Sequence, residues 1–165
     1  MSVNRERPHV FVLPEDRADL QIAKSFNGEI DWSRIRQMQV LEEAGGWREV
    51  LSLFKSEHSS EMDRYPNRFM ILLIDFDYKR DYKDDRLNEA KAAIPDHLTE
   101  RVFILGAKKD PEALKRAGLG SFEEIGSSLA KDCREDRYDT WGHDMLKHNA
   151  NELARLRKAL RPILF

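Results

Sequence analysis

The chain has 165 residues, of which 41% are hydrophobic and 35% charged, and its formal net charge is −2. This length and composition predict one globular domain, residues 1–165, and the charge balance by itself gives no sign of a nucleic-acid partner. The single cysteine, Cys133, excludes an internal disulfide framework and a multi-cysteine zinc site. The polar start of the chain and the lack of a long apolar run predict a cytoplasmic protein without a signal peptide or membrane contact.

Two strands and one helix are expected in the first 45 residues. Residues 9–13 form a short apolar run that Pro14 ends, and residues 15–27 have an apolar face at helical spacing before an Asn-Gly stop. Residues 35–41 mix apolar positions with Arg and Gln, which predicts a weak strand at an edge of a sheet.

The central part of the chain continues the alternation of helix and strand. Residues 47–65 place apolar side chains on one face of a predicted helix. Residues 69–77 read Phe-Met-Ile-Leu-Leu-Ile-Asp-Phe-Asp, and the six apolar residues predict a strand buried on both faces of a sheet. A charged loop over residues 78–85 and a short helix over residues 87–94 are expected to follow.

A fourth strand and a helical C-terminal part complete the prediction. Residues 101–106 read as the strand, helices are expected to begin at Asp110-Pro111 and at Ser121, residues 132–139 read as a polar stretch, and a last helix is expected over about residues 144–160. The alternation predicts an α/β fold with a four-stranded, mainly parallel sheet between two layers of helices, a Rossmann-like three-layer arrangement. Its α/β core would span residues 8–110, with residues 111–165 as a helical extension packed on that core.

Acidic side chains follow three of the four predicted strands, at residues 15–16, 42–43 and 75–77. Right-handed crossovers bring the C-terminal ends of parallel strands to one edge of the sheet, where ligands bind in open α/β folds. Residues i and i+2 of an extended chain point the same way, so Asp75 and Asp77 are expected to share one hard cation.

At these positions the sequence resembles the topoisomerase–primase (Toprim) domain, which carries a glutamate after its first strand and an Asp-x-Asp motif after its third. Glu15 matches the glutamate, Asp19 matches the acid four positions later, and Asp75-Phe76-Asp77 matches Asp-x-Asp. The order of strands and helices matches over about residues 8–110. The glycine that commonly follows the glutamate is replaced here by Asp16, which adds a charge.

The resemblance implies Mg²⁺-dependent chemistry on nucleic acid, namely strand cleavage, strand rejoining or nucleotide polymerisation, with Mn²⁺ as a substitute metal. It implies Asp75 and Asp77 as metal ligands, with Glu15 and Asp19 completing the ligand set. Among these residues Glu15, Asp75 and Asp77 would be catalytic, with Glu15 acting as general base, general acid or a further ligand.

Three lysine and arginine side chains near the predicted strand ends are expected to steady the phosphate of the substrate. Lys108 and Lys109 follow the fourth strand, and Arg17 follows the first. The apolar C-terminal residues 162–165 and the predicted edge strand also offer surface for a homodimer.

Three alternatives stay open. The absence of the glycine and of a nucleic-acid-binding extension favours a non-catalytic binding or assembly module with the same fold. The strand ending in Asp-x-Asp is also similar to the first motif of haloacid-dehalogenase-like phosphatases, but Lys79 stands where Thr or Val is usual, and the strand is the third rather than the first. A response-regulator receiver has acids after strands one and three, but it needs a fifth strand ending in Lys-Pro, which this sequence lacks.

Three further features of the C-terminal part lead to expectations. Asn149 stands in the apolar stripe of the last predicted helix, and a buried asparagine there is expected to cap a strand edge or to fix the docking of the helix. His143 and His148 are five residues apart, which is not the spacing of a helical metal pair, so structural roles are expected. Cys133 has cationic neighbours in sequence, which are expected to lower the pKa of its thiol.

Overall fold

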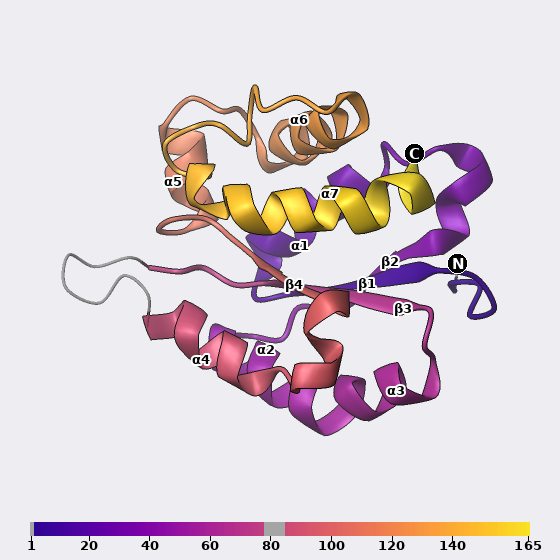
Figure 1. Cartoon of the computed structure of the whole chain (residues 1–165). Helices are drawn as coiled ribbons and strands as arrows, with labels where there is room; N and C mark the ends of the chain where they lie inside the picture. Colours follow the sequence, from indigo (N-terminus) through magenta and orange to yellow (C-terminus); the bar gives the residue numbers. More distant parts are fainter. Residues whose placement is uncertain (1, 78–84) are drawn as a thin grey trace.

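The computed structural model describes residues 2–77 and 85–165, so the expected loop at residues 78–85 lies outside the described residues except for its last residue. Four parallel strands form one sheet in the order β2-β1-β3-β4 (Figure 1). The strands are β1 (His9–Pro14), β2 (Met38–Val40), β3 (Arg68–Leu73) and β4 (Val102–Leu105). The expected parallel sheet is confirmed, and the weak strand does lie at an edge.

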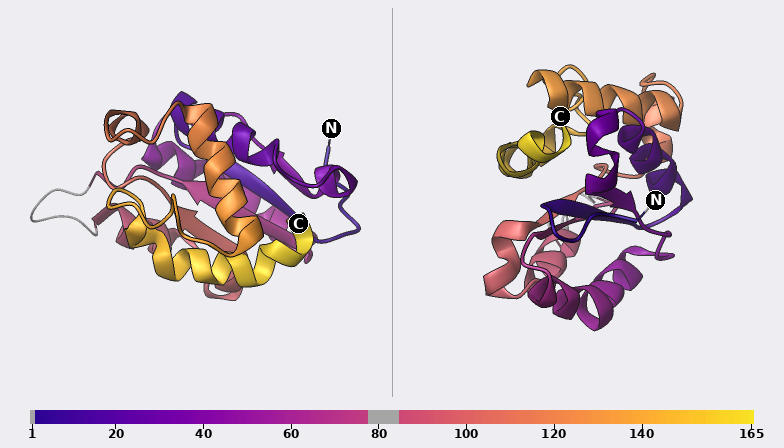
Figure 2. Two further views of the ribbon diagram at one scale, coloured as in Figure 1. Left: turned by 90° about the horizontal axis from the view of Figure 1, so that it is seen from above. Right: turned by 90° about the vertical axis from the view of Figure 1, so that its right-hand side faces the viewer.

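Helices cover both faces of this sheet, which gives three layers (Figures 1 and 2). On one face lie α1 (Arg17–Asn27), α5 (Pro111–Arg116), α6 (Phe122–Glu135) and α7 (Ala150–Leu164). On the other face lie α2 (Trp47–Leu53), α3 (Ser59–Arg64) and α4 (Asp85–Ala93). Short 3₁₀ segments occur at Trp32–Gln37, Asp96–Arg101 and Lys147–Asn149. None of the helices in the described ranges is long and apolar enough to cross a membrane.

The strands are apolar on both faces because each face packs against a layer of helices. Val12 and Ile71 belong to the core beneath α1, α6 and α7, whereas Leu13 and Leu72 belong to the core beneath α2, α3 and α4. Successive strand residues point to opposite faces, so a continuous apolar run supplies both cores. The run ahead of Asp75 is therefore required by the central position of β3.

The helix expected over residues 47–65 is present, but a π-helical turn at Phe54–His58 separates α2 from α3. Phe54 is fully buried, as is Met62 in α3. The extra residue of a π-turn shifts the helical face, and this shift keeps apolar residues of both halves toward the sheet.

Two glycines allow elements to approach more closely than a side chain would permit. A Cβ atom on Gly106, after β4, would lie 1.6 Å from the carbonyl oxygen of Ile74, which directly follows β3. A Cβ atom on Gly126, in α6, would lie 2.2 Å from the carbonyl oxygen of Ile22 in α1. The approach at Gly106 brings the end of β4 directly beside Ile74, the residue before Asp75.

Side chains of the C-terminal segment bond to the outer edge of β4. The Asn149 side chain accepts from the Gly106 amide at 3.2 Å and donates to the Gly106 carbonyl at 3.0 Å. Glu152 in α7 accepts from the Ile104 amide at 3.0 Å. The expectation that Asn149 is buried and caps a strand edge is therefore confirmed, and only 3% of its surface is exposed.

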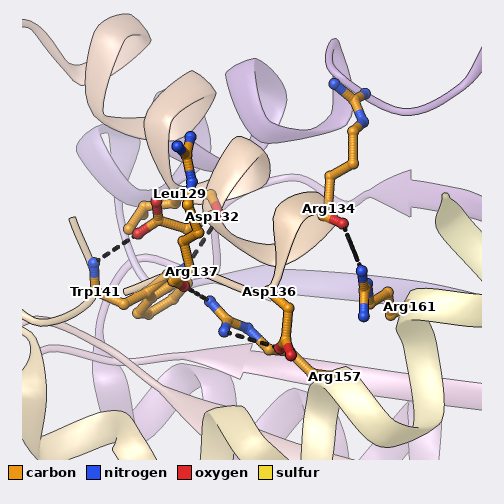
Figure 3. A network of polar contacts seen from close by, with 8 residues as sticks. All are labelled: Leu129, Asp132, Arg134, Asp136, Arg137, Trp141, Arg157 and Arg161. Atoms are coloured by element: carbon orange, nitrogen blue, oxygen red, sulfur yellow. Dashed lines mark hydrogen bonds and ion pairs between the residues drawn. The ribbon is translucent and has the colours of Figure 1, made fainter. Parts of the chain in front are cut away.

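The connection between α6 and α7 is held by the polar network of Figure 3. Asp132 is buried, and its carboxylate accepts from the backbone amides of Thr140 and Trp141 at 2.7 and 3.1 Å. The Trp141 indole donates to the Leu129 carbonyl at 3.1 Å. In α7, Arg157 donates to the Arg137 carbonyl and pairs with Asp136 at 3.4 Å, and Arg161 donates to the Arg134 carbonyl at 2.9 Å.

The bounds expected for the last helix are wrong at both ends. Residues 132–135 of the polar stretch belong to α6, in which Asp132 serves as an internal acceptor. The last helix begins at Ala150 rather than near residue 144, and it continues through Pro162 to Leu164, whose side chain is 2% exposed. Burial of Leu164 offsets the loss of one backbone hydrogen bond at the proline. The buried Leu164 side chain is therefore not part of the apolar surface that residues 162–165 were expected to offer.

Candidate functional site: a buried carboxylate cluster

The candidate site lies where the path of the chain across the sheet changes direction. From β1 the chain crosses to β2 on one side, and β3 then returns on the other side of β1. The connecting helices α1 and α2–α3 therefore lie on opposite faces, and the C-terminal ends of β1 and β3 form the topological switch point at which open α/β folds bind ligands. Glu15 directly follows β1, and Asp75 lies two residues after β3.

Local structure brings a third carboxylate to this end of the sheet. Asp16 is the N-cap of α1, and its side chain accepts from the Asp19 amide at 3.0 Å. This cap fixes the first turn of the helix. Asp19 in that turn is thereby turned toward the strand ends, with 5% of its surface exposed.

Glu15, Asp19 and Asp75 form a compact cluster, each offering a carboxylate oxygen within 4.8 Å of the others. All three are buried, with 8%, 5% and 7% of their surfaces exposed. Glu15 accepts from the Asp75 amide at 2.6 Å. One buried oxygen of Asp19 and one of Asp75 have no hydrogen-bond partner among the described residues. Buried carboxylate oxygens without partners are rare and call for a bound proton or a cation.

Burial raises the pKa values of all three carboxyls, and the charge of another carboxylate of the cluster adds to the effect at Asp19 and Asp75. For Asp75, burial followed by the charge of Glu15 raises the pKa to about 8. For Asp19, burial followed by the charge of Asp75 raises the pKa well above its usual range. Burial also raises the pKa of Glu15, against a lowering contribution from the Asp75 amide and then from Arg86. Near neutral pH the cluster therefore retains protons that a cation would displace.

Asp77 stands outside this cluster. Its backbone is left-handed, with φ of 47°, so the chain is not extended there and the argument from i, i+2 spacing does not apply. Its carboxylate lies 3.4 Å from the Arg86 guanidinium, and 44% of the side chain is exposed. The structure therefore brings together Glu15, Asp19 and Asp75 and directs Asp77 to a different partner.

Among the described residues, Arg86 in α4 is a positively charged side chain beside the cluster, and the sequence patterns do not predict it. Its guanidinium donates to the Asp75 carbonyl at 2.7 Å and lies 5.1 Å from the centre of the Trp47 ring. No spacing rule singles out this arginine, because the segment between Asp77 and α4 carries no regular pattern. Its place becomes evident only when α4 packs beside the end of β3.

The three expected phosphate ligands lie outside the cluster. Arg17 is 71% exposed and lies 3.9 Å from Glu43. The backbone of Lys108 pairs with Met145, and its charge contributes to lowering the pKa of both Asp144 and His148. Lys109 is exposed.

The two histidines and the cysteine considered in the sequence make packing contacts and hydrogen bonds away from the carboxylate cluster. His148 makes a 2.8 Å hydrogen bond to the Gly106 carbonyl and packs edge-on against Phe76, and His143 accepts from the Met145 amide. Cys133 is 2% exposed on the inner side of α6, and burial raises the pKa of its thiol. The expected lowering is wrong because the apolar surroundings outweigh the nearby arginine.

The fold and site together define a three-layer α/β protein with a buried acidic cluster at the strand ends. Comparisons of the chain with protein-family models, with curated proteins and with solved structures find no match.

Proposed function

We propose that the chain binds a divalent cation, Mg²⁺ or Mn²⁺, at the cluster of Glu15, Asp19 and Asp75 and uses it for phosphodiester cleavage on nucleic acid. The observation that carries the proposal is the set of three buried carboxylates, two of which keep an oxygen without a partner among the described residues. The position of the cluster at the switch point between β1 and β3, where α/β folds bind ligands, supports it.

The donor set fits a hard cation. All three groups are carboxylates, and Mg²⁺ prefers oxygen ligands while keeping several of its waters. A cation in the cluster would offset the repulsion between carboxylates that contributes to the raised pKa values of Asp19 and Asp75. The resemblance to the Toprim domain, which rests on Glu15, Asp19 and the motif beginning at Asp75, points to the same metal.

The residues of the chain have separate tasks in this proposal. Bound Mg²⁺ would neutralise the negative charge that develops on a phosphate during in-line displacement. Asp19 and Asp75 hold the cation. Glu15 accepts from the Asp75 amide and thereby fixes the end of β3, and its raised pKa suits a group that takes up or delivers a proton.

Deep burial of the cluster favours a second candidate, a non-catalytic binding or assembly module. In that case shared protons replace the cation and the three carboxyls serve to join β1, α1 and β3. The receiver alternative is less well supported, because the sheet within the described residues has four strands and α7 bonds to the edge of β4.

Calorimetric titration with Mn²⁺ separates the two candidates. The wild type should bind, while Asp19→Asn and Asp75→Asn should each weaken binding at least about tenfold, since each removes a charged ligand. Asp144→Asn is the matched control, because this carboxylate is 82% exposed and pairs with Lys147. Equal binding by wild type and Asp75→Asn would refute the cation site.

A screen with single- and double-stranded DNA and RNA then tests the chemistry. With Mg²⁺ or Mn²⁺ present, the wild type should cleave at least one substrate and Asp75→Asn should not. Cation binding at the cluster with every substrate left intact would reject the cleavage and favour the binding module.

A further inference from the structure

The two terminal nitrogens of the Arg86 guanidinium contact different residues beside the candidate site. One nitrogen donates to the Asp75 carbonyl at 2.7 Å, and the other lies 3.4 Å from the Asp77 carboxylate. The Trp47 ring lies beneath the guanidinium at 5.1 Å. The first bond and the ring fix the position of Arg86, and the second contact is with a side chain that is 44% exposed.

The contact with Asp77 is the exchangeable one. This ion pair is partly exposed, with 25% of the Arg86 side chain and 44% of the Asp77 side chain accessible, so water and salt screen it and reduce its contribution to stability. A phosphate offers stronger acceptors, and the planar arginine fork suits phosphate oxygens. An incoming phosphate therefore competes well with Asp77 for the same nitrogen while the bond to Asp75 remains.

The backbone at Asp77 supports a role outside the cluster. Its backbone is left-handed, with φ of 47°, a conformation in which aspartate is enriched. Its carboxylate contacts Arg86 and lies apart from the three clustered carboxylates.

Resting on the proposed function, we propose that Arg86 forms the phosphate subsite beside the cation and that Asp77 is its counter-ion in the free protein rather than a cation ligand. Binding of a phosphate then replaces Asp77 at Arg86. The two aspartates of Asp-x-Asp have different tasks, one at the cation and one at the arginine.

Two titrations test this assignment, one with Mn²⁺ and one with inorganic phosphate added to Mg²⁺-saturated protein. Arg86→Gln should lower phosphate affinity at least about tenfold, because a charge-assisted bond is lost. Its Mn²⁺ affinity should stay the same or rise, since a neighbouring positive charge is removed. A structural defect would weaken both. Arg48→Gln is the matched control, because Arg48 also lies over Trp47, at 4.9 Å, but is exposed.

Asp77→Asn provides the second readout. It should leave Mn²⁺ affinity within about threefold and raise phosphate affinity by about two- to fivefold, the size expected when one weak exposed ion pair is removed. Arg86→Lys, which keeps the charge but loses the fork, should give an intermediate phosphate affinity and guards against misfolding of the glutamine variant.

Several results would overturn the assignment. A tenfold loss of Mn²⁺ affinity in Asp77→Asn would make Asp77 a cation ligand. Unchanged phosphate affinity in Arg86→Gln would refute the phosphate subsite and leave the cation site standing. The same conclusion would follow if the wild type bound Mn²⁺ but no phosphate. A wild type that binds no Mn²⁺ would remove the proposed function and the subsite together.

Discussion

Replacing Asp75 with asparagine should change how the stability of the chain depends on pH. In the folded wild type the pKa of Asp75 is about 8, compared with 3.8 for an unperturbed aspartate. Between these values the folded chain binds a proton that the unfolded chain has released, so stability falls as pH rises. Between pH 5 and pH 7 one such group removes about 2–3 kcal/mol from the free energy of unfolding.

Urea denaturation in EDTA, followed by tryptophan fluorescence at pH 5, 6 and 7, measures this effect. The quantity to compare is the stability of Asp75→Asn minus that of the wild type, which should rise by about 2–3 kcal/mol across the range. The pKa values of His9, His58 and His148 are lowered by burial, so their contributions to stability rise with pH. These histidines are present in both chains, and their contributions cancel in the difference.

Asp144→Asn is the control for this measurement. Its pKa is lowered by its hydrogen bond to Lys147, so its contribution to stability is lost only as pH falls below the usual aspartate range. Its difference from the wild type should therefore stay flat between pH 5 and pH 7. A flat difference for Asp75→Asn as well, or one that falls as pH rises, would refute the argument that burial and neighbouring carboxylates raise its pKa.

Three further changes should have separable effects. Gly106→Ala should cost at least about 3 kcal/mol in urea denaturation, because its Cβ would lie 1.6 Å from a backbone carbonyl oxygen, whereas Gly28→Ala, with 3.3 Å to its nearest neighbour, should be tolerated. Asn149→Ala should cost about 2–4 kcal/mol, because it leaves backbone groups at the end of β4 without partners, and the exposed Asn151→Ala should change stability by less than about 0.5 kcal/mol; equal effects would contradict this role. Cys133 should react with a thiol reagent only after urea is added, because it is 2% exposed, and rapid reaction of the folded chain would contradict that burial.

The sheet could be predicted from the sequence because its signals are local. Apolar runs at residues 9–13 and 69–74 and within the strand predicted over residues 101–106 indicate buried strands, and β1, β3 and β4 lie within one residue of these positions at each end. The mixed composition of residues 35–41 indicated an edge, and β2 is the short edge strand. The order of the strands in the sheet depends on crossovers, which these runs do not encode.

The candidate site could be predicted only in part. Glu15 and Asp75 follow buried strands, so parallel topology alone brings them together. The i, i+2 spacing places Asp77 beside Asp75 only if the chain is extended, and Asp77 instead has a left-handed backbone. Arg86 reaches the site through packing of α4 on the sheet, and no local pattern in the sequence records that contact. The reversal of the expected pKa shift at Cys133 has the same origin, since burial is a tertiary property.

The bonds from Asn149 and Glu152 to β4 have a consequence for association between molecules. A bare outer strand is a template onto which a strand of another molecule can add. Here two side chains imitate the hydrogen-bonding groups of a fifth strand, and this edge is closed to sheet-to-sheet growth. A chain cut before residue 149 would uncover the amides of Ile104 and Gly106 and should aggregate through them. Asn149 and Glu152 thus protect the β4 edge of the sheet from pairing with a strand of another molecule.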